Sequence, residues 1–410
     1  MKRTFKYLIL TSSALILMVA ALSSCNGTKG TKDTANLLSV KTVRSEMSRC
    51  PDGSYLDGMN GTLKWNYTTG LELLSFLDVY RTYGGDDILR YVDGWYDRMI
   101  DEKGTIYKYK VSNYSTDHIC PGRTLFDLYD ITGKEKYRCA MDTLWKQIQG
   151  QPRTPEGGFW HKQVYENQMW LDGLYMAQPF YAIYVSRYIP EKDRLPYYND
   201  IISHFRIVAD HTFDPSTGLY RHAWDSSHKM FWADPVTGQS LHAWGRALGW
   251  YSMALVDVLE VIPQDVEARK ELLDILGQIF IVALPKVADP ATGLWYQVLD
   301  RPGGEGNYLE ATCCAMFSYS LLKAVRLGYL PSDMKDYALR TYDAFQKEFV
   351  AEDENGEIEL RRCCEVAGLG GKDNRSGDYA YYIGEKVRSN DPKGIGPLIW
   401  AALEKERQEK

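Results

Sequence analysis

The chain has 410 residues and a formal net charge of −6, and its Lys and Arg residues form no basic block or stripe. This balance argues against a nucleic acid partner. The 30 Tyr and 11 Trp residues exceed what a helical core needs. Most of them are expected in the core, but such side chains also line pockets that stack on flat ligands or sugar faces.

The first residues, Met1–Arg3, are basic and precede a mostly apolar run from Tyr7 to Leu22. This pattern predicts a secretory signal. The run ends in Leu22-Ser-Ser-Cys25, which resembles a bacterial lipobox. Residues 1–25 are therefore interpreted as a lipoprotein signal peptide, with Cys25 as the lipidated residue. The expected location is the bacterial cell envelope, facing the periplasm. A plain cleaved signal with an incidental Cys is the alternative.

The residues after Cys25 are polar and rich in Gly and Thr, so residues 26–40 are predicted to be a tether that cannot bury a core. No second linker interrupts residues 41–410, which are expected to form a single domain.

Apolar residues with helical spacing predict a mainly helical protein. The clearest helical segments are residues 71–80, 125–129, 174–184, 253–260, 272–280 and 316–325. Strand-like alternation is limited to short segments, residues 106–110 and 357–360.

Internal repeats indicate how these helices are arranged. Gly85-Asp-Asp-Ile-Leu89 resembles Gly133-Lys-Glu-Lys-Tyr137, and Asp214-Pro-Ser-Thr-Gly-Leu-Tyr220 resembles Asp289-Pro-Ala-Thr-Gly-Leu-Trp295. Each segment lies beside a predicted helix and carries turn residues. Helix pairs that recur every ~50 to 75 residues predict a closed ring of about six helical hairpins. An open solenoid is the rival, but its repeats would be shorter and more uniform.

In such a ring, long loops at one end can build a site. The loops with unusual polar residues are 113–122, 153–172 and 222–250, and we expect them to converge on one mouth.

Asp172 is the first candidate catalytic residue. It is a single carboxylate among Trp170, Leu171, Leu174, Met176 and Phe180. Apolar surroundings disfavour the charged form of an acid, and a protonated carboxyl group is a general acid. The alternative is that Asp172 is a helix N-cap, because an apolar helical segment follows it.

A second carboxylate, Asp117, lies in the loop before another predicted helix, where it is either a site residue or a turn residue. His161 precedes Asp172 by eleven positions and is either a ligand contact or a surface residue. Further along, His222 and the pair Trp244 and Trp250, which bracket Arg246, complete the set. Two Trp residues around an Arg suit an anion held against an aromatic wall, although the Trp side chains could belong to the core.

Together these residues describe a pocket with two carboxylates, imidazoles, one Arg and aromatic faces, which suits an acidic carbohydrate. Seven Cys residues follow Cys25, and no Cys-x-x-Cys pair or His-rich cluster suggests a zinc site. No metal and no cofactor is predicted. The pairs Cys313-Cys314 and Cys363-Cys364 are expected to be small buried side chains.

Four segments resemble glycoside hydrolase family 105, the unsaturated rhamnogalacturonyl hydrolases. They are WLDGLYMAQPF (170–180), WADPVTGQSLHAWGRALGW (232–250), NYLEATCCAMFSYSLLKAVRLGYL (307–330) and SGDYAYYIGEKVRSNDPKGIGPLIWAALE (376–404). The related family 88 of unsaturated glucuronyl hydrolases shares the fold and chemistry. The resemblance implies a mainly α protein with an (α/α)6 barrel, in agreement with the predicted ring.

The resemblance also implies roles for individual residues. Asp172 falls on the proton-donor position and Asp117 on that of the second essential carboxylate. The implied sugar contacts are Tyr67, His161, His222, Trp244, Arg246 and Trp250. Many members carry Arg-Gly-x-Gly-Trp and Arg-Asp-Gly-Ser where this chain has Arg246-Ala-Leu-Gly-Trp250 and Arg375-Ser-Gly-Asp378. These departures leave the leaving sugar open.

The implied function is removal of a 4,5-unsaturated uronic acid, galacturonyl or glucuronyl, from the non-reducing end of lyase-generated oligosaccharides. The expected partners are this oligosaccharide and, through the lipid anchor alone, a membrane; the sequence does not predict an oligomeric state. The alternatives are an ordinary inverting glycosidase acting on saturated acidic glycans and a lipoprotein that binds glycans without turnover. A sugar epimerase is a more distant possibility.

Overall fold

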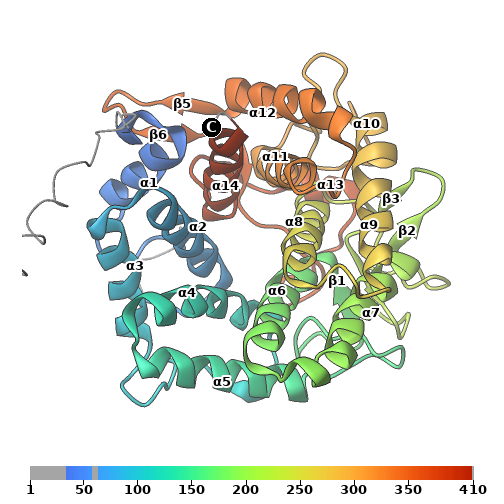
Figure 1. The fold of residues 1–410 in the computed structure, drawn as a ribbon. Coiled ribbons are helices and arrows are strands. Elements are labelled where there is room, and N and C mark those ends of the chain that lie inside the picture. Colours follow the sequence, from blue (N-terminus) through green and yellow to red (C-terminus); the bar gives the residue numbers. More distant parts are fainter. Residues whose placement is uncertain (1–33, 58–62, 409–410) are drawn as a thin grey trace, which may run out of the picture.

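The computed structural model describes residues 34–57 and 63–408, and its helices form an (α/α)6 barrel (Figure 1). Its inner helices are α2 (Tyr67–Tyr83), α4 (Arg123–Thr132), α6 (Leu171–Tyr188), α8 (Gly245–Val261), α11 (Ala311–Arg326) and α14 (Pro392–Gln408). Each inner helix packs against the next, and α14 packs back against α2. The ring is therefore closed, as the repeats predicted, and an open solenoid is wrong.

Outer helices surround this ring (Figure 1). They are α1 (Leu38–Arg49), α3 (Asp86–Met99), α5 (Glu135–Gly150), α7 (Leu195–Thr212), α9 (Arg269–Gly277) with a π-helical turn (Gln278–Ala283) and α10 (Leu284–Val287), and α12 (Lys335–Phe349). Burial explains the two layers. In α8 every residue from Gly245 to Leu259 is buried, whereas α3 buries one face only. A helix that is apolar all round belongs inside, and an amphipathic helix covers the outside.

The chain runs along an outer helix, crosses one end of the barrel in a long loop, and returns along an inner helix. Short turns join each inner helix to the next outer one. Gly84, Gly85 and Gly133 lie in such turns with positive φ, which glycine adopts without steric cost. The long loops include residues 100–122, 151–170, 213–244, 288–310 and 350–391. The N-termini of the inner helices therefore meet at the end with the long loops.

Short antiparallel strand pairs stabilise these loops. The pairs are β1 (Gln168–Trp170) with β4 (Ala223–Asp225), β2 (Phe213–Asp214) with β3 (Leu219–Tyr220), β5 (Val350–Glu352) with β6 (Ile358–Leu360), and β7 (Cys363–Cys364) with β8 (Val387–Arg388). The last long loop also contains the short helix α13 (Tyr379–Gly384). Turns of 3-10 helix lie at Thr34–Asn36, Val111–Asn113, Thr116–His118, Cys120–Gly122, Glu191–Asp193 and Ser332–Met334.

The two Asp-Pro repeats form the same turn. The backbone N–H of Gly218 donates to the carbonyl of Asp214 at 2.7 Å, and that of Gly293 donates to Asp289 at 2.7 Å. Both glycines have positive φ, 76° and 74°. The paired Cys residues at 313–314 and 363–364 are fully buried, and the described cysteines form no disulfide, so their expected packing role is confirmed.

Some expected boundaries were wrong. The predicted strand at 357–360 matches β6, but at 106–110 only Ile106 pairs, with Ile100, and Lys108 has a positive φ of 56° that ends the extended segment. The tether was expected to reach residue 40, yet α1 begins at Leu38, and Ser39 and Val40 are buried. The signal segment and Cys25 lie outside the described residues. Within the described part, no helix is long and apolar enough to cross a bilayer.

Candidate active site

The three polar loops predicted to converge do meet at the inner-helix N-termini. The N–H of Thr116 donates to the carbonyl of His161 at 3.0 Å, and the N–H of Leu171 donates to that of His222 at 3.1 Å. Strand β1, just before α6, pairs with β4, just after His222. These backbone bonds bring Asp117, His161, Asp172 and His222 into one site.

Asp172 is the second residue of α6, and the cap position belongs to Trp170. Its carboxylate makes no capping bond, so the N-cap interpretation is wrong. Its Oδ2 atom is buried without a hydrogen-bond partner among the described residues and lies 3.3 Å from Nε2 of His222. The next residue is glycine because a Cβ at Gly173 would stand 2.9 Å from Nδ1 of His161.

Asp117 has a different environment. Its Oδ2 lies 2.5 Å from Nζ of Lys162, and its Oδ1 lies 3.5 Å from Nε2 of His161. Burial alone would raise the pKa of Asp117, but the charge and the hydrogen bond of Lys162 hold it below the usual value. Asp117 is therefore an ionised carboxylate at neutral pH, whereas no cation pairs with Asp172 within the described residues.

His161 is packed among aromatic rings. It stacks on Trp170 with ring centroids 4.8 Å apart. Tyr165 also stacks on Trp170, with centroids 5.1 Å apart. Burial lowers the pKa of His161 to about 4, although Asp117 acts in the opposite direction. The imidazole is therefore neutral at physiological pH, which allows it to accept as well as donate a hydrogen bond.

A cavity of about 520 Å³ opens beside Asp117. Its lining residues are Lys64, Asn66, Tyr67, Ser112, Asn113, Ser115, Asp117, His118, Lys162, Gln163 and Val164. Asp172 and Arg246 do not line it directly. Both nevertheless lie close enough to influence the hydroxyl of Tyr67, whose pKa is raised first by burial and then by Asp117, while Arg246 acts in the opposite direction. Tyr67 therefore lies between the open cavity and the group formed by Asp117, Asp172 and Arg246.

Arg246 lies behind this cavity and is 1% exposed. Its Nη1 donates to the carbonyl of Cys364 at 2.5 Å, and its guanidinium lies 4.8 Å from the ring of Trp244. The Nε atom has no hydrogen-bond partner among the described residues. Burial would lower the pKa of Arg246, but nearby anionic groups, including Asp391, raise it, so the side chain stays charged.

The two predicted Trp residues are both buried. Trp250 packs edge-on against Tyr67, with centroids 6.1 Å apart, and Trp244 packs against His222 at 4.8 Å. They form the wall behind Tyr67 and His222. Direct stacking of either ring on a sugar stays a prediction.

Sequence reasoning missed two residues. The first is Lys162, which directly follows His161. A Lys in a loop is usually exposed, so nothing in the local sequence indicates its ion pair with Asp117. Tyr382 belongs to the motif at 376–404, and its hydroxyl lies 2.7 Å from Nδ1 of His222. A contact between residues 160 positions apart leaves no pattern in a single sequence.

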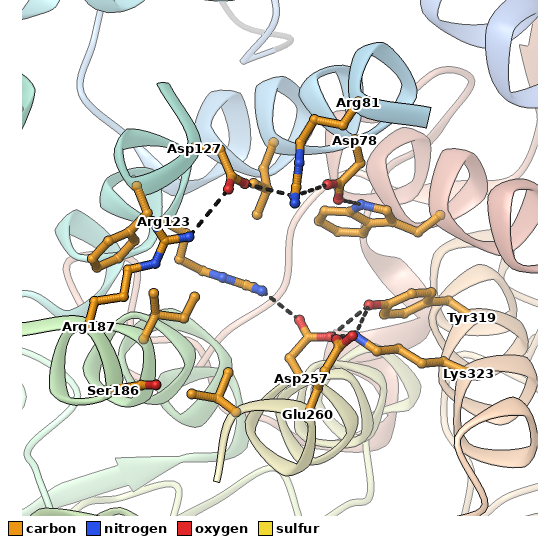
Figure 2. A pocket seen from close by; sticks show the side chains of 15 residues that line it. Asp78, Arg81, Arg123, Asp127, Ser186, Arg187, Asp257, Glu260, Tyr319 and Lys323 are labelled. Carbon is orange, nitrogen blue, oxygen red and sulfur yellow. Dashed lines mark hydrogen bonds and ion pairs between the residues drawn. The ribbon is translucent and has the colours of Figure 1, made fainter. Parts of the chain in front are cut away.

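Another cavity, of about 410 Å³, lies at the opposite end of the barrel, where the inner helices end (Figure 2). Figure 2 shows Arg123, Asp257 and Lys323 in a chain of ion pairs across it. None of the predicted site residues lines this cavity. The described residues contain no group of three or more His, Cys, Asp or Glu side chains placed to hold a metal ion.

Comparison with known proteins identifies the family and supports the fold. The model of Glycosyl Hydrolase Family 88 matches residues 38–409. A solved family 105 glycoside hydrolase from Clostridium acetobutylicum superposes with a TM-score of 0.85 at 43% identity, covering 90% of this chain and 99% of that one. The chain belongs to this group of glycoside hydrolases, families 88 and 105.

Among curated relatives of this glycoside hydrolase, Protein Atu3128 of Agrobacterium fabrum is 41% identical over 193 residues, which is 46% of this chain and 82% of the relative. The unsaturated rhamnogalacturonyl hydrolase YesR of Bacillus subtilis is 26% identical over 273 residues, covering 64% of this chain and 72% of the relative.

The ion pair at Asp117 leads to a pH prediction. Because Lys162 helps to keep the pKa of Asp117 low, Asp117 remains ionised as the pH falls below the usual titration range of a carboxyl group. In Lys162→Met, burial acts with less opposition and the pKa of Asp117 rises. We expect the acidic limb of the pH profile of kcat/KM to move to higher pH, with a loss within about tenfold at pH 7.

The matched control is Lys64→Met. Lys64 lines the same cavity but pairs with no carboxylate in the described residues. This variant should keep the acidic limb of the wild-type enzyme. Equal shifts in both variants would show that general loss of positive charge, and not the Lys162–Asp117 pair, governs the limb.

Proposed function

We propose that the enzyme removes a 4,5-unsaturated uronic acid, galacturonyl or glucuronyl, from the non-reducing end of lyase-generated oligosaccharides such as rhamnogalacturonan fragments. The observation that carries the proposal is the contrast between two carboxyl groups in one site. Asp117 is ion-paired with Lys162, whereas among the described residues Asp172 pairs with no Lys or Arg and lies 3.3 Å from Nε2 of His222. Different environments for two acids are how enzymes separate the roles of acid and base.

The chemistry follows from the substrate. In a 4,5-unsaturated uronic acid, C4 and C5 form an enol ether with the ring oxygen. Protonation at C4 leaves an oxocarbenium ion at C5, water adds there, and the resulting hemiketal opens and expels the aglycone. Ordinary glycosidases protonate the glycosidic oxygen instead. Asp172 donates the proton to C4, and Asp117, as a carboxylate, assists the attacking water.

The remaining residues bind the sugar in this proposal. Arg246, with a histidine of the site, holds the uronate carboxylate, because a guanidinium provides charge-assisted hydrogen bonds in a fixed geometry. Tyr67 contacts the sugar from the open cavity. Trp244 and Trp250 provide the aromatic wall. The name of the Bacillus subtilis relative supports rhamnogalacturonan fragments as the first substrates to test.

An absorbance assay tests the function. Disaccharides generated by lyases from pectin, ulvan-type and glycosaminoglycan polymers carry an ultraviolet-absorbing enol ether, which hydration destroys. We expect loss of this absorbance with at least one of these substrates. Cleavage of saturated acidic glycans without absorbance loss would indicate an ordinary inverting glycosidase. Tight binding without turnover would indicate a glycan-binding protein.

We also propose that Cys25 carries a lipid that anchors the enzyme in the cell envelope, facing the periplasm. The ending Leu22-Ser-Ser-Cys25 supports this location. A membrane-fraction distribution that stays the same in Cys25→Ala would contradict it.

A further inference from the structure

Tyr382 is a buried polar residue that the proposed reaction does not use. Its side chain is fully inaccessible to solvent, and its hydroxyl lies 2.7 Å from Nδ1 of His222. The other ring nitrogen of His222, Nε2, lies 3.3 Å from Oδ2 of Asp172. His222 therefore lies between Tyr382 and the proposed proton donor, Asp172.

The hydroxyl of Tyr382 determines which nitrogen of His222 carries the proton. A neutral histidine is protonated on one ring nitrogen, and the hydrogen bond made by the other nitrogen decides which one. Among the described residues, the hydroxyl has no hydrogen-bond partner except His222. If Nδ1 donated to this oxygen, the phenolic O–H would be buried without an acceptor, which is unfavourable. The hydroxyl therefore donates to Nδ1, and the ring proton lies on Nε2.

Both rings are held in place by their neighbours. Tyr382 packs against Trp244 with ring centroids 6.0 Å apart, and its main-chain carbonyl accepts from Nε2 of Gln297 at 3.2 Å. His222 is fully buried and packs against Trp170 as well as Trp244. Nε2 of His222 and Oδ2 of Asp172 are both buried and make no hydrogen bond in the described structure, although they lie 3.3 Å apart. The Asp172 carboxyl group is therefore an acceptor close enough to receive the N–H on Nε2.

We propose that Tyr382 is a positioning residue, which holds His222 in the tautomer whose Nε2–H stabilises the carboxylate form of Asp172. The inference rests on the proposed function. As the proton leaves Asp172 for C4, the O–H bond breaks, the C4–H bond forms with the electron pair of the double bond, and Asp172 becomes an anion. Nε2 lies 3.3 Å from Oδ2 of Asp172, within reach of a hydrogen bond that forms as the negative charge develops, so the Nε2–H stabilises the transition state more than the ground state.

The tautomer can be measured without any substrate. Nitrogen-15 NMR of protein labelled at histidine distinguishes protonated from unprotonated ring nitrogens, and the signals of His222 are assigned as those missing from His222→Gln. We expect a protonated Nε2 and an unprotonated Nδ1 in the wild-type enzyme. A protonated Nδ1 in the wild-type enzyme would overturn the proposal, even if no Tyr382 variant folds.

Kinetics of Tyr382→Phe test the consequence. We expect kcat to fall about 10- to 100-fold, which corresponds to the loss of a hydrogen bond to a charged group. KM should stay within about threefold of the wild-type value. His222 should no longer be held in a single tautomer. The matched control is Tyr381→Phe, because the Tyr381 hydroxyl accepts from the N–H of Gly368 and not from the site. The control should keep kcat within about twofold and keep the tautomer.

Two kinetic results would contradict the proposal for Tyr382. An unchanged kcat in Tyr382→Phe, or an equal loss in both variants at similar melting temperatures, would overturn the positioning role. Failure of the proposed function is separate, because it would appear as unchanged enol-ether absorbance in the wild-type enzyme while the NMR result for His222 stands.

Discussion

Asp172→Asn is expected to abolish turnover while substrate affinity stays within about an order of magnitude. The amide keeps the shape of the side chain but has no proton to give to C4. General acid catalysis contributes about 10²- to 10⁴-fold, and protonation of carbon without a positioned acid is slow, so the loss in kcat should lie at the upper end of this range or beyond it. Single-turnover absorbance and equilibrium binding of an unsaturated disaccharide measure the two effects separately.

Structural damage would not explain such a loss. Asp172 makes no capping bond to α6, so the isosteric amide should leave the melting temperature near that of the wild-type enzyme. Asp117→Asn should also be severe, but the two residues act on opposite limbs of the pH profile. In the proposed mechanism Asp172 acts in its protonated form, so it should govern the alkaline limb, whereas Asp117 acts as a carboxylate and should govern the acidic limb.

The reaction in D₂O identifies the atom that is protonated. Hydration of the enol ether by the wild-type enzyme should place one deuterium at C4 of the released sugar, which mass spectrometry and NMR detect. Product without deuterium at C4 would mean that the double bond is not protonated. The assignment of Asp172 as the donor to carbon would then have to be replaced by ordinary glycoside hydrolysis.

Much of the fold could be predicted because its signals are local. Helical spacing marks α2, α4, α6, α8 and α11, and the repeated Asp-Pro turns at Asp214 and Asp289 have the same hydrogen bond and the same positive-φ glycine. The alternation at residues 106–110 misled because a loop that crosses a surface can alternate apolar and polar residues as a strand does. Only the backbone conformation of Lys108 separates the two cases.

The candidate site could be predicted from the sequence where a single residue stands out, but not where its environment depends on a distant neighbour. An isolated Asp in an apolar segment is visible in the sequence at Asp172. The support of His222 by Tyr382, or of Asp117 by Lys162, arises only when loops from different hairpins meet. Likewise, no local pattern predicts that Arg246 is buried against the carbonyl of Cys364.

The ion pairs at the far end of the barrel lead to the largest expected effect on stability (Figure 2). Asp257 is buried between Nη2 of Arg123 and Nζ of Lys323, each at 2.8 Å, and also accepts from the hydroxyl of Tyr319 at 2.7 Å. Burial would raise the pKa of Asp257, but the two cations lower it to about 2. These interactions join α4, α8 and α11 across the barrel axis, so their loss should loosen the closed ring.

Asp257→Asn leaves two buried cations without their shared counter-charge, which costs about 3–5 kcal/mol for a broken buried pair. The matched control is Glu260→Gln, because Glu260 also pairs with Lys323 but is 51% exposed, and an exposed pair contributes about 0–1 kcal/mol. Urea midpoints at neutral pH measure both. Because the folded pKa of Asp257 lies below its unfolded value, its contribution should be present above about pH 4 and lost as the pH falls towards 2, so the difference between wild-type and Asp257→Asn should shrink over that range. An equally small change in the urea midpoint in both variants would show that the buried ion pairs of Asp257 do not stabilise the barrel.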